Sequence, residues 1–295
     1  MNRIGGMVYV VTPVYNRKKL TERFLKCLFN QTYKDIEVVI VDDGSTDGTS
    51  DMIENLYPNV TLIKGTGDLW WSGGTNEGLL YVIEKAEDQD YVLIINDDLE
   101  FESDYIEKLV SFANRHPKTL VGSVVVDIQH PNIIWDGGRM TNWFTAKDRI
   151  LHEGRSLNDF EEEAFFEVSQ LTGRGMLAPV QVFKDAGIYD AVRFKHRGDT
   201  EFPVRATKFG YKQVVFYNAI VKSHVDNTYE FDIKDEYQLS DIRRYFFDFR
   251  SSFWVKFRFY FALKTAKSPF QFISFFTCDM IRITVHFLKR LRLTS

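Results

Sequence analysis

The stretch "YVLIINDDLEF", Tyr91–Phe101, runs from a short apolar segment directly into two adjacent carboxylates, Asp97 and Asp98. Three comparable apolar runs precede it: "MVYVVTPV" (Met7–Val14), "IEVVIV" (Ile36–Val41) and "VTLIK" (Val60–Lys64). Short, nearly continuous apolar runs are typical of parallel strands that are covered on both faces. Helical patterns fill the segments between them: Lys18–Asn30, Thr46–Leu56 and Gly74–Ala86. This alternation predicts an α/β fold with a Rossmann-like, mostly parallel sheet flanked by helices.

Each predicted strand is followed by polar residues, in the sequences "TPVYNR", "DDGSTDGTS", "GTGDLWWSGG" and "NDD". The carboxyl ends of parallel strands lie at one edge of a sheet, and α/β proteins bind their ligands there. A fixed carboxylate such as Asp42 can accept a hydrogen bond from a pyrimidine N–H or a ribose hydroxyl. Asp97 and Asp98 offer hard oxygen atoms, which bind Mg²⁺ or Mn²⁺ together with substrate phosphates. The alternative is that each polar cluster is only a strand-turn-helix junction.

The charge of the chain is unevenly distributed. The 295 residues carry a net charge of −4, and 44% of them are apolar, which is ordinary for one large folded domain with or without an appendage. The segment Arg243–Ser295 holds eleven Lys or Arg against two Asp and so carries +9, which leaves −13 for the rest.

Cys27 and Cys278 lie far apart and predict neither a disulfide framework nor a zinc site, which fits a reducing cytoplasm. The pattern of a secretory signal is not seen in the first residues.

Five segments together carry a resemblance to a known family. They are "TPVYNR", "VIVDDGSTDGT", "IINDDLEF", "TGRGMLAPVQVFKDAGIYD" and "RGDTEFPVRATKFGYK". In order and spacing they resemble the inverting glycosyltransferases of family 2, which have the GT-A fold, over residues 7–224. The resemblance implies an enzyme that uses Mg²⁺ or Mn²⁺ and moves a sugar from a nucleoside diphosphate to a hydroxyl.

The resemblance also implies roles for individual residues. Asp199 would be the catalytic base, and Asp98 and His224 would bind the metal. A larger set would hold the nucleotide and the donor sugar: Pro13, Tyr15, Asp42, Asp68, Trp71, Asn76 and Asp97. Arg174 and Glu201 would lie on the acceptor side. Without the family, His224 would be an ordinary histidine after a strand, and the acids of "RGDTEF" would only favour a helix start.

The chemistry of inversion asks for these groups independently. A single displacement at the anomeric carbon needs a base for the attacking hydroxyl and an electrophile for the leaving diphosphate. Three residues depart from the family pattern, in which Asp, Glu and Arg are frequent at these places: Asn96, Gly198 and Thr75. Asn96 leaves Asp98 as the main metal ligand. Trp70 and Trp71 either form a wall for the sugar or pack between helix and sheet.

The substrates are less sharply defined. The segment "GDLWWSGG" is similar to that of bacterial rhamnosyltransferases, so dTDP-rhamnose is the expected donor and a UDP-hexose the second choice. The expected acceptor is a hydroxyl of a lipid-linked precursor of a cell-surface polysaccharide. The alternatives are a nucleotide-sugar-binding protein without transferase activity and a nucleotidyltransferase. The first predicted strand is not followed by GxGxxG, which argues against a nucleotide-dependent dehydrogenase.

Residues 231–295 are expected to form a helical C-terminal extension of a catalytic domain of residues 1–230. The extension mixes aromatic with basic residues, and Ser268 and Pro269 divide it into two helices. Charged residues interrupt its most apolar window, so we expect no membrane span. We expect interfacial helices that hold a cytoplasmic protein on the inner face of the membrane through anionic lipid. The alternative is a helical cap or a homodimer surface, and no motif for nucleic acid binding is present.

Overall fold

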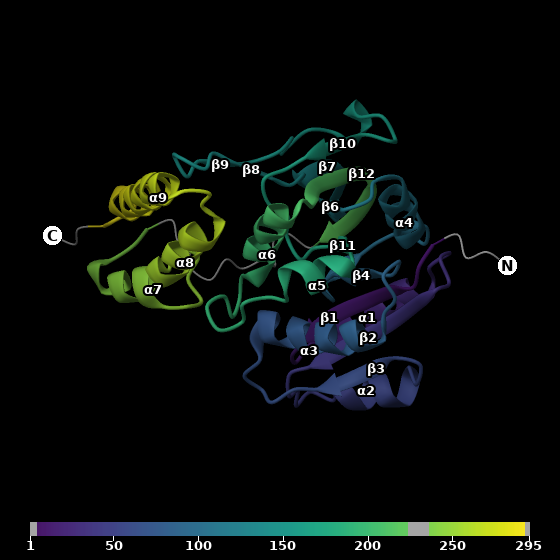
Figure 1. Ribbon diagram of the computed structural model, residues 1–295. Coiled ribbons are helices and arrows are strands. Elements are labelled where there is room, and N and C mark those ends of the chain that lie inside the picture. Colours follow the sequence, from purple (N-terminus) through teal and green to yellow (C-terminus); the bar gives the residue numbers. More distant parts are fainter. Residues whose placement is uncertain (1–4, 224–235, 293–295) are drawn as a thin grey trace. The chain divides into compact units, whose positions relative to one another are not determined.

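The computed structural model describes residues 5–223 and 236–292 (Figure 1). The chain forms two compact units. The first unit consists of Met1–Arg139 and Ile150–Val225, and the second of Met140–Arg149 and Asp226–Ser295. The predicted metal ligand His224 lies outside the described residues.

The first unit is built on a ten-stranded sheet whose main order is β10-β12-β6-β11-β4-β1-β2-β3, with β5 beside β12 and β7 beside β6. The four predicted strands are present and pair in parallel: β1 (Val8–Val14), β2 (Ile36–Asp42), β3 (Thr61–Lys64) and β4 (Tyr91–Ile94). The other strands of this sheet are β5 (Leu99–Glu100), β6 (Thr119–Asp127), β7 (His130–Asp136), β10 (Phe165–Glu167), β11 (Met176–Pro179) and β12 (Lys212–Ser223). A separate pair is formed by β8 (Arg139–Thr141) and β9 (Asp148–Ile150). Since β11 runs antiparallel between β4 and β6, the sheet is mixed. The order of its strands and of the helices between them confirms the predicted α/β fold.

Helices cover both faces of this sheet (Figure 1). They are α1 (Lys18–Phe29), α2 (Thr49–Leu56), α3 (Trp70–Lys85), α4 (Tyr105–Arg115), α5 (Gln181–Ala186) and α6 (Gly198–Ala206), with short 3-10 helices at Leu157–Asp159 and Thr207–Phe209. Val10 of β1 belongs to the core on one face with side chains of α1, α2 and α4. Its neighbour Val11 belongs to the core on the other face with side chains of α3, α5 and α6. The strands are therefore apolar at successive positions because both of their faces are buried.

Helix α3 begins at Trp70, before the predicted start at Gly74. The cause is Asp43, whose buried carboxylate accepts hydrogen bonds from the backbone N–H groups of Gly67, Leu69 and Trp70 at 2.7, 2.9 and 3.0 Å. The first N–H groups of a helix have no partner within the helix, so an external acceptor stabilises the start. This acceptor follows β2, whereas α3 follows β3. The residues next to Trp70 therefore do not indicate where the helix begins.

The second unit contains α7 (Ile242–Phe247), α8 (Val255–Thr265) and α9 (Pro269–Lys289), preceded by a 3-10 helix at Leu239–Asp241. Ser268 accepts a hydrogen bond from the backbone N–H of Gln271 at 3.1 Å, which confirms the predicted break before α9. Trp143 stacks on Phe261 and Phe275 with ring centroids 6.2 and 5.7 Å apart, which explains why residues 140–149 belong to this unit. Within the described ranges, none of the helices has the length and apolarity needed to cross a membrane.

Asp43→Ala should lower the free energy of unfolding by about 2 kcal/mol or more, because backbone N–H groups at the start of α3 lose their acceptor. Urea denaturation followed by circular dichroism measures this change. The control is Asp88→Ala, which removes a carboxylate that is 78% exposed and paired with Lys184, and which should change stability by less than about 0.5 kcal/mol. Equal effects of the two substitutions would contradict the role given to Asp43.

Candidate active site

Two loops meet at the carboxyl ends of β1 and β2. The backbone N–H of Asn16 donates to Ser45 Oγ at 2.8 Å, and the backbone N–H of Thr46 donates to Asn16 Oδ1 at 2.8 Å. The side chain of Tyr15 is exposed on the first of these loops. Pro13 lies in β1 opposite Val41 of β2, one residue before Asp42. Three residues predicted to hold the nucleotide thus lie along one edge of the sheet.

Asp42 is a buried and fixed hydrogen-bond acceptor. Its carboxylate accepts from the backbone N–H of Ser45 at 2.9 Å and from Ser50 Oγ at 2.5 Å. Asp68, in contrast, is exposed, accepts from the indole N–H of Trp70 at 2.7 Å and lies 3.2 Å from Nζ of Lys195. These contacts order the turn after β2 and the loop that leads into α3.

The end of β4 carries Asn96, Asp97 and Asp98, which have different surroundings. Asp97 is 2% exposed and accepts from Arg17 Nη1 at 2.9 Å and from Thr21 Oγ1 at 2.8 Å. Burial raises the pKa of Asp97, and the guanidinium of Arg17 acts in the opposite direction. Since its two oxygen atoms are engaged by α1 and the residue before it, Asp97 links this helix to the sheet.

Asp98 is the carboxylate that remains accessible for a metal ion. Its side chain is 39% exposed, and Oδ2 lies 3.3 Å from Arg17 Nη1, while Oδ1 meets no donor in the described part of the chain. The described residues contain no group of three or more His, Cys, Asp or Glu that could hold a metal. Mg²⁺ and Mn²⁺ are often bound by one or two carboxylates, with water and phosphate oxygens completing the shell. Asp98 therefore fits an ion that is held largely by its substrate.

A continuous series of contacts joins Asp199 to the end of β4. Asp199, half-buried at the start of α6, accepts from the backbone N–H of Gly173 at 3.0 Å. A Cβ atom at Gly173 would lie 2.5 Å from the ring of Trp71, so only glycine fits against this tryptophan. The indole N–H of Trp71 donates to Asn96 Oδ1 at 2.9 Å. The predicted base Asp199, the predicted donor residue Trp71 and the strand end that bears the predicted metal ligand Asp98 thus belong to one connected region.

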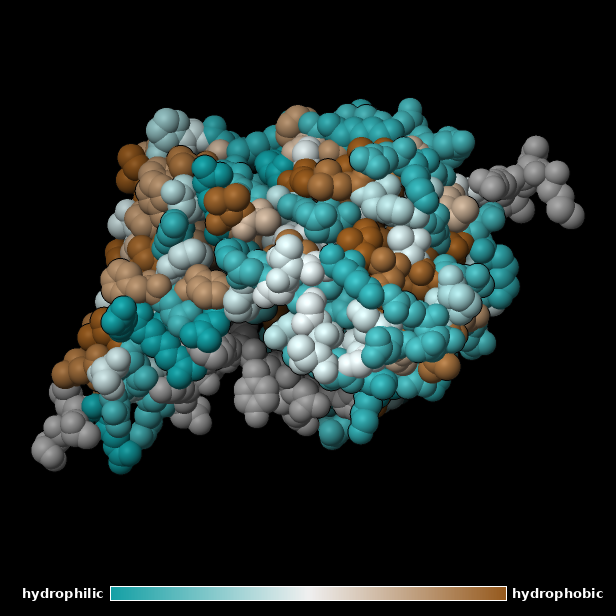
Figure 2. Space-filling view, turned by 90° about the horizontal axis from the view of Figure 1, so that it is seen from below, coloured by the Kyte–Doolittle hydropathy of each residue, from teal (hydrophilic) through white to brown (hydrophobic). Residues whose placement is uncertain are grey.

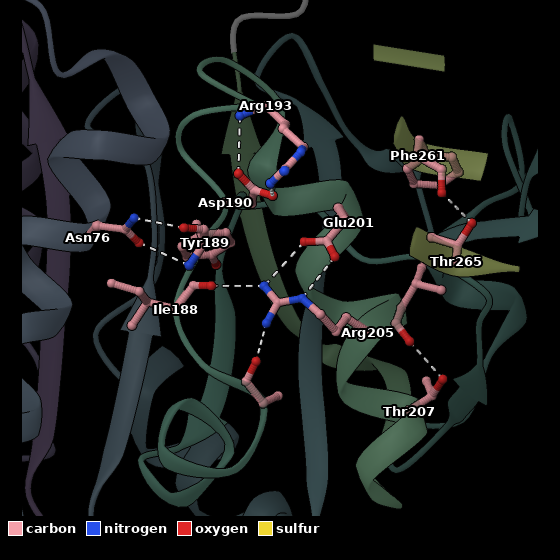
Figure 3. A network of polar contacts seen from close by, with 12 residues as sticks. Asn76, Ile188, Tyr189, Asp190, Arg193, Glu201, Arg205, Thr207, Phe261 and Thr265 are labelled. Atoms are coloured by element: carbon pink, nitrogen blue, oxygen red, sulfur yellow. Dashed lines mark hydrogen bonds and ion pairs between the residues drawn. The ribbon is translucent and has the colours of Figure 1, made fainter. Parts of the chain in front are cut away.

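Asn76 and Glu201 are engaged in internal contacts (Figure 3). The side-chain amide of Asn76 donates to the carbonyl of Tyr189 at 2.8 Å and accepts from its N–H at 3.0 Å. Glu201 is fully buried, and its Oε1 lies 2.8 Å from Nε of Arg205. Arg205 also donates to the carbonyl of Ile188 at 2.8 Å. Asn76 directly, and Glu201 through Arg205, therefore fix the segment that precedes α6.

Arg174 lies between two glycines, as the sequence indicates. Its guanidinium carbon is 4.6 Å from the ring centroid of Trp135. Gly175 has a φ of +86°, and a Cβ atom there would collide with the hydroxyl of Tyr105. This loop brings its backbone close to β6 and presents Arg174 stacked on an aromatic face.

Two residues of this region were not predicted from the sequence: Arg17, which immediately precedes α1, and Thr21, which lies in its first turn. Both contact Asp97, and their spacing of four residues is the signal that could have indicated a shared helix face. Arg17 stands in the quoted segment "TPVYNR", but nothing in that segment specifies which carboxylate it meets.

Comparisons with known proteins agree on one family. The family described as "Glycosyl transferase family 2" matches residues 9–168. An N-acetylglucosaminyl-diphospho-decaprenol L-rhamnosyltransferase of Mycobacterium tuberculosis is 26% identical over 241 residues, which cover 73% of this chain and 75% of that protein. A GalNAc(5)-diNAcBac-PP-undecaprenol beta-1,3-glucosyltransferase of Campylobacter jejuni is 28% identical over 151 residues, which cover 51% of this chain and 46% of the relative.

Solved structures agree with the fold. A mannosyltransferase from Pyrobaculum calidifontis, in complex with GDP-Man and Mn²⁺, has a TM-score of 0.60 at 17% identity and covers 94% of this chain and 70% of that one. Residues 1–349 of TarS from S. aureus have a TM-score of 0.59 at 15% identity, with coverage of 95% and 72%.

Proposed function

The chain belongs to glycosyl transferase family 2, and on this basis we propose that it transfers a sugar, with inversion, from a nucleoside diphosphate to an acceptor hydroxyl. The observation that carries this proposal is the series of contacts from Asp199 through Gly173 and Trp71 to the strand end that bears Asp98. An accessible carboxylate for a metal and a second carboxylate for a base are held in one region, as a single displacement requires.

In the proposed reaction the acceptor hydroxyl attacks the anomeric carbon from the face opposite the diphosphate. A bond forms between the acceptor oxygen and this carbon, and the bond from the carbon to the diphosphate oxygen breaks with its electron pair. Asp199 takes the proton of the hydroxyl, a contribution that is typically about 10²- to 10⁴-fold. Asp98, with His224 as a second ligand, would hold Mg²⁺ or Mn²⁺, which neutralises charge on the departing diphosphate.

The other residues are assigned around this centre. We place the nucleobase and ribose against Pro13, Tyr15 and Asp42, because a desolvated carboxylate beside an exposed aromatic ring suits both groups. The donor sugar and phosphates would lie beside a further set: Asp68, Trp71 and Asp97. Asn76, predicted for the donor set, and the fully buried Glu201, predicted for the acceptor side, would act on the site indirectly, by fixing the segment before α6. Arg174 would face the acceptor.

The donor that we favour is dTDP-rhamnose, with a UDP-hexose second. One relative is by its name an L-rhamnosyltransferase and another a glucosyltransferase. The names of both describe acceptors linked through diphosphate to a polyprenol. We therefore propose a lipid-linked glycan acceptor and a role in the synthesis of a cell-surface polysaccharide.

We further propose that residues 1–230 are the catalytic domain and that residues 231–295 hold it on the inner face of the membrane. Figure 2 shows apolar side chains on the surface of the second unit. On α9 five large apolar residues are between 41% and 72% exposed: Phe270, Ile273, Ile281, Val285 and Leu288. Their spacing places them on one helix face, opposite the buried Phe275, Ile283 and Phe287.

An anionic lipid surface suits this face better than a second copy of the chain. The segment Arg243–Ser295 carries +9, so a second copy would bring like charge to the interface. A hollow of about 640 Å³ in the same unit is lined by Arg243, Arg244 and Arg250 together with Phe247, Phe249 and Trp254. Phe247 is 65% exposed, and basic groups beside an exposed aromatic ring are typical of surfaces that lie in the headgroup layer.

Asp199→Asn should lower the hydrolysis of the nucleotide sugar by about 10²-fold or more, because water in the acceptor place loses its base. The dissociation constant of the nucleoside diphosphate, measured by calorimetry, should stay the same. Asp159→Asn, which removes an exposed partner of Arg155, serves as the control and should leave both quantities unchanged. Normal turnover of Asp199→Asn would assign the base to another residue.

Asp98→Ala should abolish most of the effect of Mn²⁺ on nucleotide binding, because Asn96 is already bonded to Trp71 and is a weaker ligand. Calorimetric titration of dTDP and UDP with Mn²⁺ and with EDTA measures this effect. If EDTA leaves binding and turnover of the unchanged protein as they are, the proposed metal dependence is wrong.

The double substitution Ile273→Asp and Ile281→Asp should weaken sedimentation with phosphatidylglycerol vesicles by about tenfold or more, since two exposed apolar side chains that would insert into the membrane are lost and negative charge is added. High salt should release the unchanged protein only in part, because it screens basic groups and not apolar insertion. Val192→Asp, at a site 86% exposed in the first unit, is the matched control. Equal sedimentation of the double variant and the control would exclude this face as the contact.

A further inference from the structure

Within residues 5–223 and 236–292, the guanidinium of Arg17 contacts other side chains through one nitrogen atom, Nη1. Nη1 donates to Asp97 at 2.9 Å and lies 3.3 Å from Asp98. In the described part of the chain, Nε and Nη2 have no acceptor, and the side chain is 44% exposed. The residue immediately precedes α1, so its position is fixed by the backbone at the carboxyl end of β1.

The unused side of the guanidinium has the geometry of a phosphate site. Nε and Nη2 present two parallel N–H bonds, which match two oxygen atoms of one phosphate group. We propose that Arg17 binds the diphosphate of the donor through this edge, beside the ion held at Asp98. This inference rests on the proposed function and adds a phosphate-binding residue to it.

A purely structural role would leave this geometry unexplained. To neutralise the buried Asp97, a lysine ammonium or the Nη1 group alone would be enough. Instead the guanidinium bridges Asp97 and Asp98 through Nη1, and its second edge has no partner among the described residues. Its positive charge also reduces the repulsion that a diphosphate would meet from these two carboxylates, with or without a bound metal.

The test measures binding without metal, so that it does not depend on turnover. Calorimetry in EDTA compares dTDP with thymidine, and UDP with uridine, for the unchanged protein, Arg17→Gln and Arg17→Lys. Arg23→Gln is the matched control, because Arg23 lies in α1, which Arg17 immediately precedes, is 40% exposed and pairs with Glu100 at 3.1 Å. Thermal unfolding of each variant accompanies the titrations, and Arg17→Lys keeps a positive partner for Asp97 if Arg17→Gln is too unstable.

We expect the unchanged protein and Arg23→Gln to bind the diphosphate about 10- to 100-fold more tightly than the nucleoside. Both Arg17 variants should lose most of this preference and keep their affinity for the nucleoside. If Arg17→Lys keeps the full preference, the paired Nε and Nη2 edge is not what binds the phosphates. If Arg17→Gln keeps it, or if nucleoside and diphosphate weaken equally, Arg17 is only a structural partner of Asp97. If no nucleotide or nucleoside binds the unchanged protein either in EDTA or with Mn²⁺, it is the proposed function that fails, and the role of Arg17 fails with it. If the diphosphate binds with Mn²⁺ but shows no preference over the nucleoside in EDTA, the proposed function stands and the role given to Arg17 is wrong.

Discussion

A buried carboxylate is costly unless it is hydrogen-bonded, and this constraint shapes the edge of the sheet where the strands end. Asp42, Asp43 and Asp97 are all buried there. The carboxylate of Asp43 accepts hydrogen bonds from backbone N–H groups at the start of α3 and in the loop before it. The carboxylate of Asp97 accepts hydrogen bonds from Arg17 and Thr21. Each acid thereby fixes a loop or a helix start against a strand end. The region is held in place before any ligand arrives, which limits the ordering cost of binding.

The same constraint separates the acids by task. Carboxylates that are fully used by the protein cannot also bind a metal or take a proton without losing those partners. Asp98 and Asp199 differ from them, because Asp98 is partly exposed and, as far as the structure describes the chain, Asp199 accepts one hydrogen bond, from Gly173. The two acids proposed for chemistry are thus those with coordination capacity left over.

Much of the fold could be predicted from the sequence because its signals are local. The apolar runs gave the four parallel strands of the first half, and Ser268 gave the start of α9. The start of α3 could not be predicted, because its cap comes from Asp43 after another strand. The contact of Arg17 with Asp97 and the packing of Trp143 on α8 and α9 could not be predicted for the same reason, because both join residues far apart in the chain. The site residues were named from family motifs, and their contacts became apparent only in three dimensions.

In the second unit, several basic residues pair with acids of the unit itself and are therefore not all available to an anionic surface. The buried Asp279 lies 3.3 Å from Arg258 and 2.5 Å from Arg282, so two of the eleven basic residues of Arg243–Ser295 neutralise an acid inside the unit. Arg250 and Arg292 likewise pair with Asp248 and Glu236. A count of the basic residues alone therefore overstates what an anionic surface would meet. The net charge of +9 already subtracts Asp248 and Asp279, and the pairing of Arg292 with Glu236, outside the segment, lowers it by one more. The exposed apolar face of α9 points away from the core of the unit, although the ring centroid of Phe270 at its start lies 6.2 Å from that of Phe144. Attraction between charges would orient the unit, and burial of this face would supply most of the affinity.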